Sequence, residues 1–126
     1  MIIGIGVDLV HAHRVRELID RYGDRFLLKI FLPNEIRYCQ HGRTNHLSFA
    51  AHIAAKEACS KAIATGWRQG VHWKCFEVTH EPSGKPTITM HGRALEIAAQ
   101  LGVSHVAVSL SHDDEYAIAQ VVMESQ

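Results

Sequence analysis

An alanine-rich segment in the middle of the chain constrains the fold most. The stretch LSFAAHIAAKEACSKAIATG, residues 47–66, consists mainly of good helix formers, so we predict one long helix, with Ser48 as a candidate N-cap and Gly66 after the last turn. Methyl groups cover much of this helix and let other elements approach closely. Lys56, Glu57 and Lys61 then have little open surface, and a half-buried Glu57 needs a cationic partner.

The other patterns predict one α+β domain over residues 1–126: an N-terminal strand and two β-hairpins packed with three to four helices. The segments with strand character are 2–10, the hairpin 71–92 around EPSGKP, and the hairpin 105–124 turning at HDDE. The segments with helical character besides 47–66 are 13–23, which Gly23 ends, a brief helix after Pro33 with Asn34 as a candidate cap, and 93–102, which Gly102 ends. We read residues 24–32 as a short apolar segment.

Composition excludes several classes of protein. Thirteen basic and thirteen acidic residues give no net charge, which argues against a nucleic-acid binder. The start, MIIGIGVDLV, contains Asp8 and lacks the pattern of a signal peptide, and no apolar run approaches the ~20 residues that span a bilayer. Cys39, Cys59 and Cys75 show no CxxC spacing, which is typical of reduced thiols. We therefore expect a cytoplasmic protein with no membrane or nucleic-acid partner.

Two acids on separate elements are the leading candidates for chemistry. Asp8 in an apolar strand is costly without a partner, although an exposed edge position or a helix cap would also explain it. Glu57 and Lys61 have the spacing of an ordinary surface pair worth ~0.2–0.5 kcal/mol. Asp8 and Glu57 together suit Mg²⁺, which prefers one or two carboxylates plus water and substrate phosphate oxygens. With Lys61 as a point charge beside the phosphates, the set indicates phosphoryl-type transfer.

Other motifs give weaker signals. His11 and His13 invite a zinc reading, but no Cys or His pattern completes a tetrahedral set. SGKP, residues 83–86, lacks the first Gly and the Ser or Thr of a Walker motif. SLSHDD places Ser109 and Ser111 on one strand face without a nucleophile elbow, so a phosphate contact is the better reading than a hydrolase.

In their order and spacing, four motifs resemble those of the bacterial holo-acyl-carrier-protein synthases, the small 4′-phosphopantetheinyl transferases. They are GIGVDLV, FAAHIAAKEACSKAIATG, GKP and SLSHDDEYAIA. The resemblance covers nearly the whole chain and implies the 4′-phosphopantetheinyl transferase fold. It also implies Mg²⁺-dependent transfer of phosphopantetheine from coenzyme A to a serine of apo acyl carrier protein, with release of adenosine 3′,5′-bisphosphate. Members of this family are homotrimers with active sites between subunits.

The resemblance also assigns residues. By match to the family motifs, Asp8 and Glu57 are the magnesium ligands and Lys61 contacts the pyrophosphate of coenzyme A. The residues that match positions near the nucleotide end of coenzyme A are Gly84, Lys85, Pro86, Ser111 and His112. Arg14 and Arg21 are expected to bind the carrier protein. The match leaves the base that accepts the serine proton unassigned, and it does not separate a fatty-acid carrier from a polyketide carrier.

The chain departs from the family motifs at two positions. His52 stands where an arginine commonly binds coenzyme A phosphates, and a histidine cannot make a bidentate phosphate contact. Affinity for coenzyme A is then lower, or Arg43 substitutes. Ala64 replaces the first glycine of GTG and restricts the loop. These changes motivate an alternative, a catalytically weakened member that binds coenzyme A or a carrier; another is a plain interaction protein. Lys56 is either a second phosphate contact or, by preference, a solvated neighbour.

Overall fold

Two antiparallel sheets form the β part of the protein. The computed structural model describes residues 1–42 and 45–126, so Arg43 lies outside the described residues. Strands β1 (Ile2–His11), β5 (Tyr116–Glu124) and β4 (His105–Asp113) form a three-stranded sheet in that order. Strands β2 (Phe76–His80) and β3 (Pro86–Met90) form a separate two-stranded sheet. The predicted N-terminal strand and both hairpins are confirmed.

The described residues contain five α-helices, more than the three to four expected. They are α1 (Ala12–Tyr22), α2 (Asp24–Ile30), α3 (Pro33–Cys39), α4 (Asn45–Ala62) and α5 (Gly92–Leu101), with a 3-10 turn at Trp73–Cys75. The apolar segment 24–32 contains α2, a helix that was not predicted, which starts directly after α1 because Gly23 adopts a positive φ of 55°. Asn34 is not a cap: Leu32 is the N-cap of α3, and Pro33 follows it.

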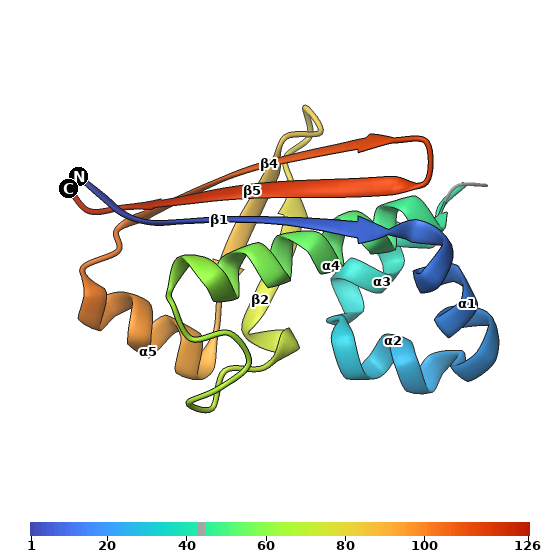
Figure 1. Ribbon diagram of the computed structural model, residues 1–126, viewed down its shortest axis with the longest axis horizontal. Helices are drawn as coiled ribbons and strands as arrows, with labels where there is room; N and C mark the ends of the chain where they lie inside the picture. The colour runs from blue at the N-terminus through green and yellow to red at the C-terminus, as the bar shows by residue number, and fades with distance from the viewer. Residues whose placement is uncertain (43–44) are drawn as a thin grey trace.

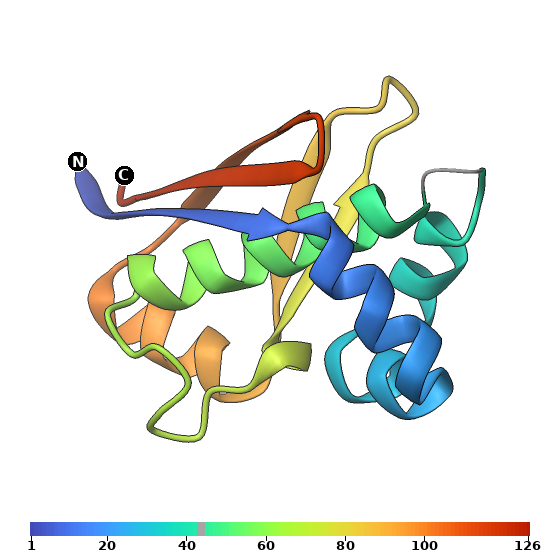
Figure 2. The ribbon, with the colours of Figure 1, turned by 45° about the vertical axis from the view of Figure 1, so that its right-hand side comes forward.

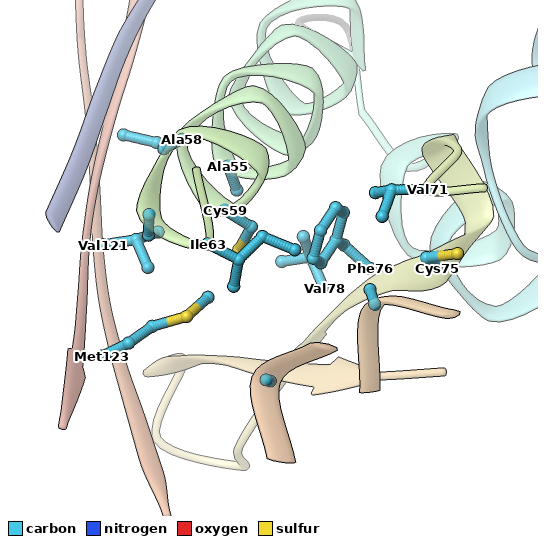
Figure 3. Packing of buried hydrophobic residues seen from close by; sticks show 14 of the residues in the cluster. Ala55, Ala58, Cys59, Ile63, Val71, Cys75, Phe76, Val78, Val121 and Met123 are labelled. Atoms are coloured by element: carbon cyan, nitrogen blue, oxygen red, sulfur yellow. The ribbon is translucent and has the colours of Figure 1, made fainter. Parts of the chain in front are cut away.

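Helix α4 is the centre of the molecule. It runs along one face of the β1-β5-β4 sheet, with the β2–β3 hairpin beside it, α1 to α3 near its start and α5 near its end (Figure 1). In the turned view, the tip of the β2–β3 hairpin and the β4–β5 turn project on the same side of the molecule (Figure 2). Ala55 and Cys59 of α4, and Ile63 directly after it, pack in the core between the helix and the two sheets. There they face Val121 and Phe76 (Figure 3). The alanines therefore give the close packing that the sequence indicated.

Two glycines of β1 allow the closest approach of strand and helix. A Cβ atom on Gly4 would lie 2.0 Å from the carbonyl oxygen of Ala62, and one on Gly6 would lie 1.9 Å from that of Ala58. Only glycine fits at such a distance. Side chains alternate along a strand, so Asp8 lies on the same face as these glycines and points to α4. The GIGVD motif thus places an acid against the helix that carries Glu57.

The ends of α4 differ from the prediction. The helix begins at Asn45, so Ser48 lies in its first turn instead of capping it, and it ends at Ala62. The amides of Thr65 and Gly66 bond to the carbonyl of Ser60 in a tight turn. Ala64 adopts a φ of 62° in this turn, a left-handed conformation that glycine accepts more readily. The predicted restriction at Ala64 is therefore a real backbone strain.

Candidate active site on β1 and α4

Asp8, Glu57 and Lys61 meet where β1 crosses α4. The Lys61 ammonium lies 3.0 Å from Asp8 Oδ1 and donates a second hydrogen bond to the carbonyl of Val7 at 3.0 Å. Asp8 is neither an edge residue pointing to water nor a helix cap, because its side chain is 19% exposed and the helix α1 has His11 as its N-cap. Lys61 bonds to the strand instead of forming the helix-surface pair with Glu57 that its spacing allowed.

The pKa of Glu57 responds to burial and to a second acid, Asp8. Burial raises the pKa of Glu57, and the negative charge of Asp8 raises it further, while Trp67 and Lys61 oppose the shift. The indole Nε1 of Trp67 is buried and close enough to Glu57 to favour its charged form, but within the described residues it does not reach full hydrogen-bond geometry with any acceptor. The charge of Asp8 thus acts on Glu57 across the crossing of β1 and α4.

These residues fit a hard divalent cation. Two carboxylates from two rigid elements supply the number of protein ligands that Mg²⁺ prefers, and a cation between them would relieve the repulsion that raises the pKa of Glu57. Across residues 1–42 and 45–126, no group of three or more His, Cys, Asp or Glu side chains has metal-binding geometry. The candidate site is therefore a pair of carboxylates, Asp8 and Glu57, with no third protein acid, Cys or His beside it among these residues. His13, considered for zinc, lies 3.0 Å from Glu17 in an exposed pair.

Lys56 has a different role from either one predicted. Its side chain is fully buried, and its ammonium lies 2.7 Å from Oε1 of Glu35, which is also fully buried. The carbonyls of Trp73 and Phe76 accept the remaining hydrogen bonds of Lys56. Both readings of Lys56, a phosphate contact and a solvated neighbour, are wrong. Burial alone would raise the pKa of Glu35, but the hydrogen bond from His52 and the charge of Lys56 lower it overall.

His52 lies on the same buried side of α4. It is 1% exposed, its Nδ1 lies 2.9 Å from Glu35 Oε2, and its Nε2 lies 3.2 Å from Nε2 of His80. His52 and His80 line a cavity of about 230 Å³ with Tyr38 of α3 and with Leu110 and His112 of β4. Two predicted nucleotide-site residues, His52 and His112, thus share one cavity, although they are 60 positions apart in the sequence.

The GKP residues lie at the tip of the β2–β3 hairpin. Gly84 adopts a φ of 93°, and its carbonyl lies 3.4 Å from Nδ1 of His80. Lys85 is exposed at the tip, and Pro86 begins β3. Ser111 is exposed on β4, on the same strand face as Ser109, as predicted. The tip, His52 and His112 therefore form one group, and no described contact joins this group to Asp8, Glu57 and Lys61 within the single chain.

Arg14 and Arg21 are both exposed on α1. Positions 14, 18, 21 and 22 follow helical spacing, so these arginines share a face with Leu18 and Tyr22. Arg14 and Leu18 line an apolar cavity of about 400 Å³ that also includes Leu9, Phe26 and Trp73. The guanidinium of Arg21 lies 5.4 Å from the centre of the Tyr22 ring. This basic and apolar face suits an acidic amphipathic helix of a partner.

Sequence reasoning missed Glu35, Tyr38 and His80. Glu35 carried a signal, because an acid two residues after Pro33 is at the third helical position, where its side chain can accept from the N-cap amide. It does accept from the Leu32 amide at 3.1 Å. Its contacts with Lys56 and His52 cross 21 and 17 positions, and no local pattern indicates them.

Comparison with known proteins identifies the family that the chain resembles. Residues 4–121 match the model of the 4′-phosphopantetheinyl transferase superfamily. The holo-[acyl-carrier-protein] synthase of Koribacter versatilis is 49% identical over 124 residues, which cover 98% of this chain and 99% of that protein. The corresponding synthase of Solibacter usitatus is 45% identical, with 99% of this chain and 100% of that protein covered.

Solved structures agree with these relatives. The crystal structure of the holo-[acyl-carrier-protein] synthase from Neisseria meningitidis superposes with a TM-score of 0.88 at 35% identity, covering 99% of this chain and 100% of that one. The Helicobacter pylori synthase in complex with coenzyme A gives a TM-score of 0.84 at 31% identity, covering 95% of this chain and 99% of that one.

The chain therefore belongs to the 4′-phosphopantetheinyl transferase superfamily, and it is an enzyme of the holo-[acyl-carrier-protein] synthase type. The expected α+β fold of this family is confirmed.

Proposed function

We propose that this enzyme transfers 4′-phosphopantetheine from coenzyme A to a serine of apo acyl carrier protein with Mg²⁺ as cofactor and adenosine 3′,5′-bisphosphate as the second product. The observation that carries this proposal is the meeting of Asp8, Glu57 and Lys61 at the crossing of β1 and α4. Two acids and one amine at an open site match the needs of phosphoryl transfer, in which positioning and charge neutralisation supply most of the catalysis. The coenzyme A complex of the Helicobacter pylori synthase supports the choice of donor.

The roles of the site residues follow from their places. Asp8 and Glu57 would hold Mg²⁺, which when bound supplies positive charge to the pyrophosphate. Lys61 is half exposed, so its ammonium can turn from Asp8 to a phosphate oxygen and offset charge on the departing bisphosphate. Gly84, Lys85, Pro86, Ser111 and His112 would contact the nucleotide end of coenzyme A. That set keeps its cationic and hydroxyl groups exposed on the hairpin tip and on β4.

A homotrimer is part of the proposal. The outer face of β1 exposes Ile5, Val7 and Leu9 at 62%, 52% and 60%, and the neighbouring strand β5 exposes Tyr116 and Ile118. A contiguous apolar sheet face of this kind is typical of an interface between subunits. Assembly through it would also bring the hairpin-tip group of one subunit toward the Asp8 group of the next. Light scattering should give three times the mass of the chain, and Val7→Arg should reduce that mass.

The carrier partner would dock on α1. Arg14 and Arg21 lie on an exposed face beside an apolar cavity, which suits a carrier helix with acidic and apolar side chains. Arg14→Ala should raise the KM for the carrier, and high salt should reduce the difference from the wild type because screening weakens such pairs. Within the described residues no helix is long and apolar enough to cross a membrane. Cys39, Cys59 and Cys75 are free buried thiols, which supports a cytoplasmic location.

Intact-mass spectrometry of a carrier tests the function directly. The protein is incubated with coenzyme A, Mg²⁺ and apo carriers of the fatty-acid and polyketide kinds, and each carrier should gain the mass of phosphopantetheine. Omitting Mg²⁺ or using Asp8→Asn should abolish the gain. Unmodified carriers together with a thermal shift on addition of coenzyme A would indicate the weakened, binding-only alternative. Unmodified carriers with no thermal shift would indicate an interaction protein.

A further inference from the structure

A row of rings forms one wall of the 230 Å³ cavity. Tyr38 stacks on His80 with ring centres 3.8 Å apart and planes 8° apart, and the rings of His52 and His80 have centres 5.4 Å apart and planes 23° apart. The row starts at the buried carboxylate of Glu35 and ends at the carbonyl of Gly84 in the hairpin tip. Neither His52 nor His80 contacts Asp8, Glu57 or Lys61 in the described residues. The row therefore connects the core of the protein with the GKP tip.

Glu35 fixes the orientation of His52. A carboxylate only accepts hydrogen bonds, so Nδ1 of His52 carries a proton and donates to Glu35 at 2.9 Å. Glu35 also accepts from Lys56 and from the amides of Leu32 and Val78, so all of its contacts are donors from the protein. With the carboxylate held on four sides, the ring of His52 cannot flip without a loss of hydrogen bonds.

The hydrogen-bond pattern assigns the acceptor between the two rings. Gly84 offers a carbonyl oxygen, so Nδ1 of His80 donates to it across 3.4 Å. The contact between the two Nε2 atoms at 3.2 Å holds one proton. With Nδ1 of neutral His80 donating to Gly84, Nε2 of His80 is the acceptor of this contact.

The surrounding charges agree with this assignment. Glu35 and Tyr38 of α3, Lys56 of α4 and His112 of β4 face the pair, and Glu77 of β2 acts on Lys56. Burial lowers the pKa of His80, and the nearby His52 lowers it further, against the opposing effect of the Gly84 carbonyl. His80 therefore stays neutral at neutral pH.

We propose that His52 and His80 are positioning residues for coenzyme A: Glu35 holds His52, His52 donates to His80, and His80 fixes the conformation of the tip from Gly84 to Pro86. The role of the tip in binding coenzyme A rests on the proposed function. The other described bonds of the tip are local, between Glu81 and Lys85 and between Gly84 and Glu81. His80 is thus the side chain that ties the tip to the core. His52 acts on coenzyme A through His80 instead of through a direct phosphate contact.

A conservative pair of substitutions at His80 tests the proposal. His80→Phe keeps the stack on Tyr38 and loses both hydrogen bonds. The KM for coenzyme A should rise about five- to tenfold, the effect of losing the one hydrogen bond, to Gly84, that holds the tip. The kcat at saturating coenzyme A should stay within about twofold, since Asp8, Glu57 and Lys61 are untouched. His80→Gln keeps an acceptor for His52 and should recover part of the affinity.

His91→Phe is the matched control. His91 lies at the other end of the same hairpin, where its Nε2 is 2.8 Å from Oε1 of Glu77 at the surface. The KM of His91→Phe for coenzyme A should therefore match that of the wild type. An unchanged KM in His80→Phe, or an equal rise in His91→Phe, would overturn the proposal. If His80→Phe does not fold, the KM of His80→Gln for coenzyme A is measured instead. A KM of His80→Gln equal to that of the wild type would overturn the proposal.

The pH dependence gives a readout that a purely structural role would not move. As the pH falls below the ordinary His value of 6.5, a second proton at Nε2 of His80 opposes the proton of His52, and the contact breaks. The Kd of the wild type for coenzyme A, divided by that of His80→Gln, should rise toward pH 5.5. Ionisation of coenzyme A itself cancels in this ratio. A ratio that does not change with pH contradicts the shared proton.

A ligand-free measurement separates this inference from the proposed function. Amide hydrogen exchange at Gly84 and Lys85 should be faster in His80→Phe than in the wild type and unchanged in His91→Phe. Equal exchange in all three proteins overturns the positioning role, whether or not the protein binds coenzyme A. Faster exchange in His80→Phe than in the wild type, together with a wild type that binds no coenzyme A, would preserve the anchor of the tip and reject the proposed function.

Discussion

Helix α4 carries two lysines that each pair with an acid from another element, and the two pairs differ in their surroundings. Lys56 and Glu35 lie 2.7 Å apart with both side chains fully buried. Lys61 and Asp8 lie 3.0 Å apart with side-chain exposures of 51% and 19%. Positions 56 and 61 are five apart, so they face different sides of the helix. The same chemical pairing therefore serves two environments within one helix.

The difference shows what a charged pair needs in order to serve chemistry. Protein groups satisfy Glu35 on all sides, so the buried pair has no capacity left for a ligand. Asp8 and Glu57 share a site with one amine, and the pKa of Glu57 is raised by burial and by the charge of Asp8. The open group thus retains an unmet demand for positive charge. That demand, and not the presence of acids, distinguishes a candidate metal site from a structural ion pair.

The largest effect is expected from removing an acid of the open group. Glu57→Gln leaves one carboxylate for the cation, so the rate of phosphopantetheine transfer at excess Mg²⁺ should fall by orders of magnitude while the fold is kept. Glu96→Gln, in an exposed pair with Arg93, is the control and should keep the wild-type rate. A Glu57→Gln rate within a few-fold of the wild type would remove Glu57 from the mechanism.

Gly6→Ala would separate the two elements of the open site without touching the buried pair. The added Cβ would lie 1.9 Å from the carbonyl oxygen of Ala58, so β1 must move away from α4. Overpacking of this kind typically costs about 1–3 kcal/mol, and the shift should also reduce transfer by the folded protein. Urea unfolding and the transfer assay check both effects. Gly42→Asn is the control for glycine substitution, because no described atom lies near a Cβ there and Asn accepts its positive φ of 86° more readily than other side chains.

Acid should act on the buried pair. The folded pKa of Glu35 lies below its ordinary value of 4.5, so its contribution to stability is present above that value and is lost as the pH falls through the folded pKa. The free energy of unfolding should therefore decline below about pH 4.5, and the decline should be shallower in Glu35→Gln, which starts from a lower stability. Equal slopes in the two proteins would show that Glu35 does not drive the acid sensitivity.

The smallest effect is expected after the end of α4, away from both pairs. Glycine adopts the left-handed conformation at φ 62° without the steric strain that Ala64 has there. Ala64→Gly should therefore stabilise the protein by up to about 1 kcal/mol, because the strain that is relieved exceeds the entropy cost of glycine. A small rise in Tm with an unchanged transfer rate is the expected result. A fall in Tm would mean that the turn at Ala64 carries no strain.

Local patterns predicted the parts of the structure that local physics determines. The alanine-rich helix, the two hairpins and the N-terminal strand followed from periodicity and turn residues. The cost of acids in apolar surroundings singled out Asp8 and Glu57, whose role as metal ligands stays a prediction. The seven-residue helix α2 was missed because so short a segment has no clear period, and its start depends on the backbone of Gly23.

The buried half of the site depends on contacts that the sequence does not reveal. Lys56 and Glu57 are neighbours in the chain, yet one faces Glu35 and the other faces Asp8. Which of them is buried depends on where α3 and β1 pack against the helix, and that is a tertiary property. The same reason explains His52: its place in the family motif predicted only a weaker phosphate contact than arginine makes, and no local pattern indicated that Glu35 and His80 contact both of its ring nitrogens.

A paired measurement on the two lysines tests the central comparison most directly. Lys56→Met and Lys61→Met remove the same charge and keep a similar length, and each is measured for the free energy of unfolding and for the rate of transfer per folded protein. Lys56→Met should cost about 3–5 kcal/mol because it leaves Glu35 buried and unpaired, with a near wild-type rate. Lys61→Met should keep the stability within about 1 kcal/mol and lose most of the rate. The opposite assignment, in which Lys61→Met unfolds the protein and Lys56→Met stops transfer, would contradict the account.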